Sequence, residues 1–206
     1  MYQDFKSVPW CPRCGTGLSS HEVGQGYQKV KELSVYVKLK IKGRKNEYLL
    51  IWTTTPWTLP ANVAVAVNPK LEYVKYKIDR EFIWSALTPP YEPGQKADMV
   101  EKISGRSLVG IEYEPLFVVP DEYSRGAKPP YRVFPADFVS LGEGTGLVHI
   151  ASAFGEEDLN LMKAAFSGQD GYPILQTVDP DGTMKKGIIG EGKFVKETDA
   201  LIVEDL

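Results

Sequence analysis

Cysteine, histidine and long apolar stretches are all scarce in this chain of 206 residues. Two cysteines cannot build a disulfide framework, and no charged-then-apolar leader opens the sequence. We therefore expect a reduced thiol pair in a cytoplasmic protein. No apolar run approaches the ~20 residues of a membrane span, so we expect no membrane partner. The formal net charge of −3 excludes a uniformly basic nucleic-acid binder but allows a local basic face.

Glycine and proline are plentiful, at 19 and 15 residues, which favours turns and short strands over a helix bundle. Apolar and polar residues alternate over 35–41 and imperfectly over 71–78, as in half-buried strands. Further strands are predicted at 48–54, 63–67, 81–87, 115–120, 131–139 and 147–151, with helices at 97–103 and 156–166 and short β elements after them. The predicted fold is mainly β with a few helices (α+β), arranged as a barrel or a strongly curved mixed sheet.

Residues 1–33 lack this periodicity and are predicted to form a connecting arm before a domain at 34–206. The arm carries Cys11 and Cys14, a spacing that supplies half of the four ligands of a structural zinc site. His21 could add a third ligand, but no second cysteine pair follows. The simplest interpretation is a half-site completed outside the chain. A redox function is less favoured, because the pair is not placed between a strand and a helix.

Nucleophilic catalysis has little support in the spacing of the residues. There is no G-x-S-x-G elbow, and His149 lies in an apolar run that is typical of a core histidine; a Ser-His-Asp triad around it stays open. The glycines of 142–146 lead into an apparent strand, whereas a dinucleotide loop leads into a helix. We therefore predict a tight turn there, or a close approach of the backbone to a ligand.

The least ordinary stretch begins at Trp52 and continues with Thr53, Thr54 and Thr55. Threonine is common in strands, so these residues could simply end one. Pro56 forbids normal ladder pairing, however, and leaves hydroxyl and backbone groups available for the oxygens of a ligand. The composition alone does not decide between these two interpretations.

Two long motifs resemble the editing (CP1) domains of isoleucyl-tRNA synthetases, which are class I aminoacyl-tRNA synthetases. Residues 52–69, WTTTPWTLPANVAVAVNP, are similar to the threonine-rich motif of that family. Residues 144–158, GTGLVHIASAFGEED, resemble its second editing motif, and 10–23 resembles the segment that leads into the domain. The motifs stand in the family's order. The HIGH and KMSKS motifs of the synthetic core are absent, so the resemblance implies the inserted editing domain alone.

Three positions refine the resemblance. The sister valyl and leucyl enzymes typically carry Arg at the position of Thr55 and an acidic residue at that of Trp57, so the isoleucyl branch fits best. Ser152 stands where the family usually has proline, and we expect a less rigid loop there.

The resemblance implies a function and a site. The function is post-transfer editing, the hydrolysis of valine wrongly esterified to isoleucine tRNA, with valyl-adenylate as a further substrate left open. Asp158 is implied as the clamp for the α-ammonium group. His149 and Trp52 are implied as lining residues of the substrate pocket. The region of the carbonyl, the water and the terminal ribose is assigned to Thr53, Thr54 and Thr55. No general base is assigned.

The resemblance also implies partners. These are the 3′ CCA end of tRNA(Ile) carrying valine, and the remainder of the synthetase. No cofactor is expected for editing, while a zinc at Cys11 and Cys14 would be shared with a second cysteine pair of the parent enzyme. Two alternatives remain: a non-catalytic module that binds the CCA end, and the sister valyl-type activity that removes threonine.

Overall fold

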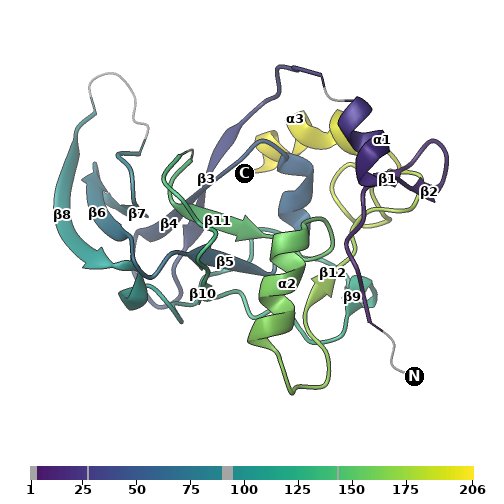
Figure 1. Cartoon of the computed structure of the whole chain (residues 1–206). Coiled ribbons are helices and arrows are strands. Elements are labelled where there is room, and N and C mark those ends of the chain that lie inside the picture. Colours follow the sequence, from purple (N-terminus) through teal and green to yellow (C-terminus); the bar gives the residue numbers. More distant parts are fainter. Residues whose placement is uncertain (1–3, 27, 90–94, 143) are drawn as a thin grey trace.

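The computed structural model describes residues 4–26, 28–89, 95–142 and 144–206. These residues form one five-stranded sheet, one three-stranded sheet and two short two-stranded ladders (Figure 1). The strands are β1 (Trp10–Cys11), β2 (Thr16–Gly17), β3 (Val35–Lys40), β4 (Glu47–Thr53), β5 (Ala64–Val67), β6 (Glu72–Ile78), β7 (Glu81–Ser85), β8 (Ala97–Ser104), β9 (Ser124–Arg125), β10 (Val133–Pro135), β11 (Leu147–Ile150) and β12 (Ile174–Leu175). The α-helices are α1 (Ser20–Gln25), α2 (Glu156–Ala165) and α3 (Val195–Asp205), and 3-10 turns lie at Pro56–Ala61, Gly105–Ser107 and Asp121–Tyr123.

The five-stranded sheet has the order β3-β4-β7-β6-β8. β3 and β4 are antiparallel, and their register pairs Val35 with Thr53. β4 and β7 are parallel, while β6 is antiparallel to both β7 and β8. Because side chains alternate along a strand, Val37 and Leu39 of β3 enter the core while Lys38 and Lys40 do not. This sheet places the carboxyl end of β4, and with it the threonines, next to the second sheet.

The three-stranded sheet, in the order β10-β5-β11, lies in the middle of the molecule. Its central strand β5 is buried on both faces. Val65 and Val67 pack into the cluster that holds the core residues of β3 and β4. Ala64 and Ala66 face the opposite cluster, which contains Met162 of α2. The small alanines allow α2 to approach the sheet closely, so the start of this helix lies beside the end of β11.

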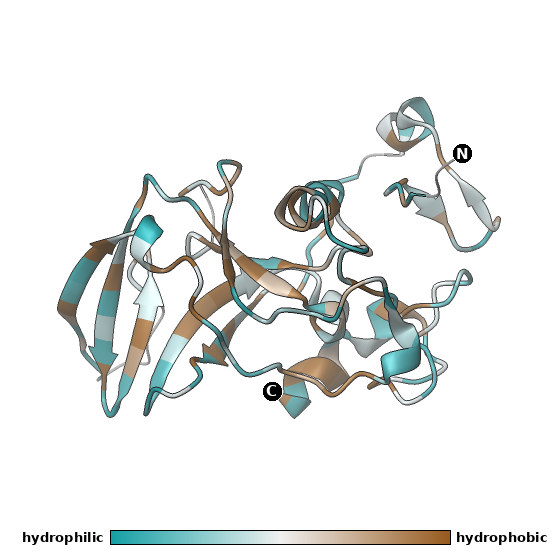
Figure 2. Cartoon of the chain, turned by 90° about the horizontal axis from the view of Figure 1, so that it is seen from below, coloured by the Kyte–Doolittle hydropathy of each residue, from teal (hydrophilic) through white to brown (hydrophobic). Residues whose placement is uncertain are grey.

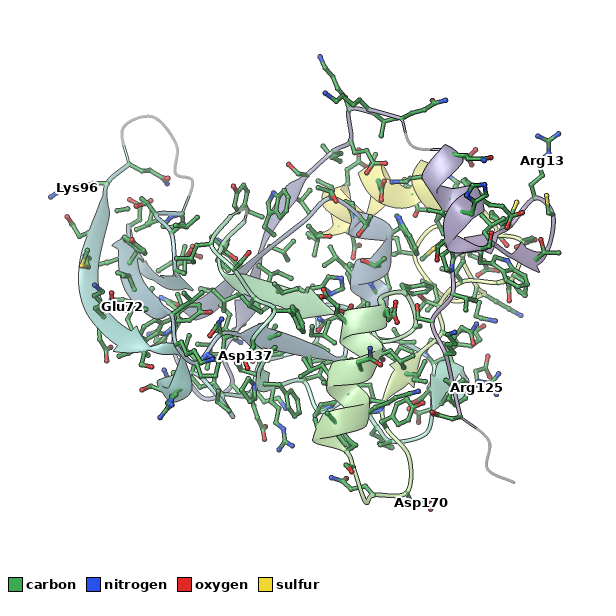
Figure 3. All side chains as sticks on the ribbon, viewed as in Figure 1. Arg13, Glu72, Lys96, Arg125, Asp137 and Asp170 are labelled. Atoms are coloured by element: carbon green, nitrogen blue, oxygen red, sulfur yellow. The ribbon has the colours of Figure 1, made fainter. Side chains whose placement is uncertain are left out.

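The N-terminal arm lies against one end of the body, away from β8 (Figure 2). Figure 3 shows Arg13 at the tip of the β1–β2 hairpin, at the opposite end of the molecule from Lys96 beside β8. The arm is tied to the body by polar contacts: the Trp10 indole donates to Pro180 O at 2.7 Å, and the ammonium of Lys163 lies 2.7 Å from the carboxylate of Asp4. The boundary between arm and domain near residue 33 stays a prediction.

The predicted mainly β architecture with a few helices is confirmed. The ladders of the described residues form separate sheets and do not close into a barrel. Three predicted elements are wrong: 97–103 is strand β8 and not a helix, 115–120 contains no strand, and the C-terminal segment ends in helix α3 and not in β structure. The strand expected at 131–139 is only the short β10. None of the helices in the described part of the chain is long and apolar enough to cross a membrane.

Candidate functional site

One open pocket of about 720 Å³ lies where the end of β4, the glycine turn before β11 and the first turn of α2 meet. The structure brings all six predicted pocket residues to its wall, from three separate segments of the chain. They are Trp52, Thr53, Thr54, Thr55, His149 and Asp158. Among the described residues that line this pocket there is no lysine or arginine, whereas Glu157 joins Asp158 there. The pocket is thus electronegative and suited to a cationic group.

The threonines are positioned because β4 stops at Thr53 and Pro56 begins a 3-10 turn. Pro56 has no N–H to continue a ladder, and it fits the first position of a helical turn. The Thr53 hydroxyl accepts the backbone N–H of Thr55 at 3.1 Å. The Thr55 hydroxyl lies 3.2 Å from that of Thr53 and 3.3 Å from that of Thr58. Thr53, Thr55 and Thr58 therefore form a connected set of hydroxyls, so the run is not merely the end of a strand.

His149 lies in β11 and is 8% exposed. Burial lowers its pKa to about 4, so the imidazole is neutral at pH 7. Its Nε2 lies 2.9 Å from the hydroxyl of Thr58, and its Nδ1 lies 3.2 Å from the side-chain nitrogen of Asn62. A Ser-His-Asp triad would need a carboxylate at Nδ1, so the triad left open by the sequence is wrong.

Asp158 lies in the first turn of α2, where the positive end of the helix dipole favours its charge. One carboxylate oxygen accepts the N–H of Ala151 at 2.9 Å, directly after β11. Burial raises the pKa of Asp158 to about 6, the Ala151 hydrogen bond opposes that rise, and the neighbouring charge of Glu157 adds to it. Gly155 makes room for this side chain, since a Cβ there would lie 2.8 Å from the Asp158 carboxyl carbon. The result is a carboxylate at the pocket wall, whose charged form a cationic partner would stabilise.

Trp52 is in contact with the glycine turn that was predicted at 142–146, of which residue 143 lies outside the described residues. Gly144 and Gly146 have φ of +75° and +74°, conformations that L side chains rarely adopt. A Cβ on Gly144 would lie 3.0 Å from the indole of Trp52. The predicted turn is confirmed, and its backbone lies directly against the Trp52 ring.

Ser152 anchors the loop between β11 and α2. Its hydroxyl is buried and donates to Pro173 O at 2.5 Å. The serine thus supplies a tether where a proline would have stiffened the backbone, and the expectation of a less rigid loop stays a prediction.

Cys11 and Cys14 lie in the β1–β2 hairpin of the arm and do not line this pocket. The Cys14 N–H points at the Cys11 sulfur, at 3.4 Å. Contact with Cys14 lowers the pKa of the Cys11 thiol, whereas the same contact raises the pKa of the Cys14 thiol, so only one of the two is favoured as the thiolate that a metal requires. Within the described residues no group of three or more His, Cys, Asp or Glu side chains is gathered for a metal, and His21 is not brought to the pair in such a group. The cysteines fit half of a zinc site, which stays a prediction.

Thr58 and Asn62 contact His149 directly, and no role was predicted for either of them. Both are nearly fully buried, at 6% and 3% exposure, within residues 58–67, which are all buried. A polar residue in a buried run must find a hydrogen-bond partner. That interruption of an apolar run was the available signal.

Curated proteins with closely related sequences match this chain along nearly its whole length. The isoleucine–tRNA ligase of Clostridium tetani is 40% identical over 214 residues, covering 99% of this chain and 19% of the relative. That of Pyrococcus horikoshii is 44% identical over 218 residues, covering 99% of the chain and 20% of the relative. The chain is homologous to one segment of these isoleucine–tRNA ligases. It spans about a fifth of the length of the relatives it matches.

No family model matches the chain. Among solved structures, the P. falciparum cytosolic leucyl-tRNA synthetase editing domain is similar over 59% of this chain and 47% of that one, with a TM-score of 0.43 and 14% identity.

Proposed function

We propose that this chain is the editing domain of an isoleucine–tRNA ligase and hydrolyses the ester that joins valine to isoleucine tRNA. The observation that carries the proposal is the composition of one pocket: a half-buried carboxylate, a neutral histidine and a set of threonine hydroxyls, with no described lysine or arginine. An aminoacyl ester brings an α-ammonium group, and Asp158 would bind it by a charge-assisted hydrogen bond. The family and the two motifs support the same assignment.

The site must distinguish valine from isoleucine by the size of the side chain that its pocket admits. A synthetic pocket built for isoleucine discriminates against valine by only about 1–3 kcal/mol, the worth of one methylene, so a second site that admits only the smaller product is needed. His149 suits the wall of that site because Thr58 and Asn62 hold its ring from both nitrogens. A ring fixed in this way cannot move aside for the extra methylene of isoleucine.

Hydrolysis breaks the bond between the carbonyl carbon of valine and the terminal ribose oxygen, and water supplies the new oxygen. His149 is a poor candidate for general base, since its pKa is near 4 and both ring nitrogens already have partners. An aminoacyl ester is already activated, so orientation of the ammonium by Asp158 and of the water by threonine hydroxyls would supply much of the rate. We assign Thr53, Thr54 and Thr55 to the carbonyl, water and ribose region.

The tRNA end would enter beside Trp52, whose ring lines the pocket and could stack on the terminal base. The other proposed partner is the remainder of the ligase. Cys11 and Cys14 would hold a structural zinc together with two ligands from that remainder, and the metal would stabilise the arm without entering the reaction.

Deacylation of Val-tRNA(Ile) and Ile-tRNA(Ile), followed in parallel, tests the proposal. The chain and a ligase that carries it are both assayed. Selective release of valine is expected, with a loss of at least 100-fold in Asp158→Ala, because the ammonium clamp is removed. Glu156→Gln is the matched control: it removes an exposed carboxylate from the same helical turn, outside the pocket, and keeps the activity.

The assay, extended by a tRNA-binding measurement and by a threonyl-tRNA substrate, separates the alternatives. Tight binding of the tRNA end with no hydrolysis, in the chain and in the ligase alike, would identify a binding module and overturn the proposal. Faster release of threonine than of valine would identify the valyl-type activity.

A further inference from the structure

Tyr113 lies behind the pocket wall, at 0% exposure, and does not touch the pocket. Its ring packs in the core cluster and meets Tyr131 edge-on, with ring centroids 6.1 Å apart. Its hydroxyl donates to the Oδ1 atom of Asn62 at 2.6 Å. A buried tyrosine hydroxyl is expected to have a partner, so the informative question is what the partner does with the contact.

Asn62 connects Tyr113 to His149. Its side-chain nitrogen donates to Ala64 O at 2.9 Å and also lies 3.2 Å from Nδ1 of His149. A backbone carbonyl only accepts, so the nitrogen of the amide must face Ala64, and Oδ1 must face Tyr113. The Nδ1 atom of His149 therefore meets a donor and must accept. The neutral imidazole then carries its proton on Nε2.

The same reasoning orders the hydroxyls on the other side of the ring. The Thr58 hydroxyl donates to Thr55 O at 2.8 Å, so its lone pairs remain to accept from Nε2–H of His149. The Thr55 hydroxyl donates to Thr58, and the Thr53 hydroxyl donates to Thr55. The Thr53 oxygen is free to accept the N–H of Thr55, as observed. Each hydroxyl and imidazole proton in this series thus has one hydrogen-bond acceptor.

We propose that Tyr113 is a positioning residue that holds Asn62, fixes His149 as its Nε2–H tautomer and so orders the threonine hydroxyls of the pocket. The order has a chemical consequence. The hydroxyls of Thr53, Thr55 and Thr58 each donate to a neighbour, and one lone pair on Thr53 and one on Thr55 remain unused by the hydrogen bonds of the series. These two hydroxyls can therefore only accept, which suits an ammonium group or a water molecule, and the carbonyl oxygen is left to Thr54, whose hydroxyl is outside the series. This part of the inference rests on the proposed function, while the tautomer does not.

Removal of the Tyr113 hydroxyl would leave Oδ1 of Asn62 buried without a donor. A buried acceptor in that position carries a large desolvation cost, which the amide can reduce only by turning away from its present contacts. The donor at Nδ1 of His149 is then lost, and the Nδ1–H tautomer becomes populated. A tyrosine that merely filled space would have no such effect, since phenylalanine fills the same space.

The nitrogen chemical shifts of the two histidine rings test the proposal directly in chain labelled with ¹⁵N-histidine. His21 is exposed in α1 and bonded to Gln25, so it serves as an internal reference. Wild-type His149 is expected as the Nε2–H tautomer, and Tyr113→Phe is expected to add the Nδ1–H form while His21 stays unchanged. Asn62→Asp replaces the donor at Nδ1 with an acceptor and is expected to move the proton to Nδ1.

Tyr131→Phe is the matched control, because it removes a hydroxyl from the partner ring that makes no contact with Asn62. It should leave the tautomer in place. In the deacylation assay, Tyr113→Phe should lower kcat by about three- to tenfold, the range expected for one hydrogen bond, with KM little changed. Thermal unfolding of each variant establishes that it folds.

A wild-type His149 in the Nδ1–H form would overturn the proposal. So would a Tyr113→Phe variant that loses thermal stability while both the tautomer and kcat stay as in the wild type. If the wild-type chain and its ligase hydrolyse neither ester but the tautomer still responds to Tyr113→Phe, the proposed function fails and the tautomer assignment stands.

Discussion

Replacing Asp158 by asparagine should stabilise the fold at neutral pH. Burial raises the pKa of Asp158 to about 6 from 3.8, so at pH 7 the folded chain carries a carboxylate in surroundings that disfavour its charge. Asparagine is of similar size and its oxygen can still accept the Ala151 N–H. The substitution therefore removes the charge while keeping the contact that ties β11 to α2.

The magnitude follows from the displaced pKa. A rise from 3.8 to about 6 corresponds to about 3 kcal/mol, since one pH unit is worth about 1.4 kcal/mol. The side chain is only partly buried, and screening by solvent reduces the expected gain to about 1–2 kcal/mol. Because the folded form holds its proton more tightly, the cost of the charge is present above pH 6 and disappears as the pH falls toward 4. The advantage of the variant should disappear over the same interval.

Urea unfolding at pH 7 and at pH 4.5 measures this difference, with Glu156→Gln as a control that removes an exposed carboxylate of the same turn and changes stability little. An Asp158→Asn protein that is more stable at pH 7 and inactive in deacylation would show that the site lowers the stability of the fold. A variant that is less stable at pH 7, or a gain that is equal at both pH values, would refute the reasoning.

Further predictions concern the same pocket and the arm. In the wild type, kcat/KM for Val-tRNA(Ile) should fall about tenfold per pH unit below pH 6, as Asp158 takes up its proton, and a profile flat to pH 5 would contradict this. In Asp158→Asn, the free energy of unfolding should fall by about 3 kcal/mol from pH 6.5 to pH 4, because the unfolded chain protonates a histidine that stays neutral when folded; adding His149→Gln should flatten that slope. Gly144→Ala should cost about 1–2 kcal/mol in urea unfolding and raise KM, because it combines a positive φ with a Cβ 3.0 Å from the Trp52 ring. Deacylation by Cys11→Ser should equal that of the wild type with or without a chelator, and a loss in either would show that a metal takes part.

The alternation of apolar and polar residues along the sequence predicted the strands that have one face in the core. β3 and β6 place successive side chains on opposite sides, so Val37 and Leu39, like Tyr76 and Ile78, repeat at intervals of two. Strand β8 carries no such pattern, because it is the edge of the sheet and nearly all its side chains are exposed. Met99 and Ile103 then stand four apart and imitate a helix. Helix α3 was missed for a related reason: one of its three buried positions is a threonine, Thr198, which interrupts the apolar period.

The candidate site is predictable from the sequence only as far as each motif reaches. Trp52 to Thr55 and His149 to Asp158 fall in two continuous stretches, and the structure brings these stretches together at one pocket because β5 pairs with β11 and β4 packs beside them. The contact between Tyr113 and Asn62 joins positions 51 residues apart. Nothing periodic marks it, since a hydrogen bond between two buried side chains depends on register and not on composition.

The hydrogen bonds behind the pocket explain how the fold tolerates two buried polar side chains. Asn62 and His149 would each destabilise an apolar core if left without partners. Here the amide has three hydrogen-bond contacts and the imidazole two, and these contacts offset the free-energy cost of burying both groups. Such a series of hydrogen bonds is rigid, because the loss of one partner leaves the next polar group buried without a hydrogen bond. Under the proposed function the pocket accepts valine and rejects isoleucine, which requires such a wall, and the same hydrogen bonds that satisfy the core would then set the size limit of the site.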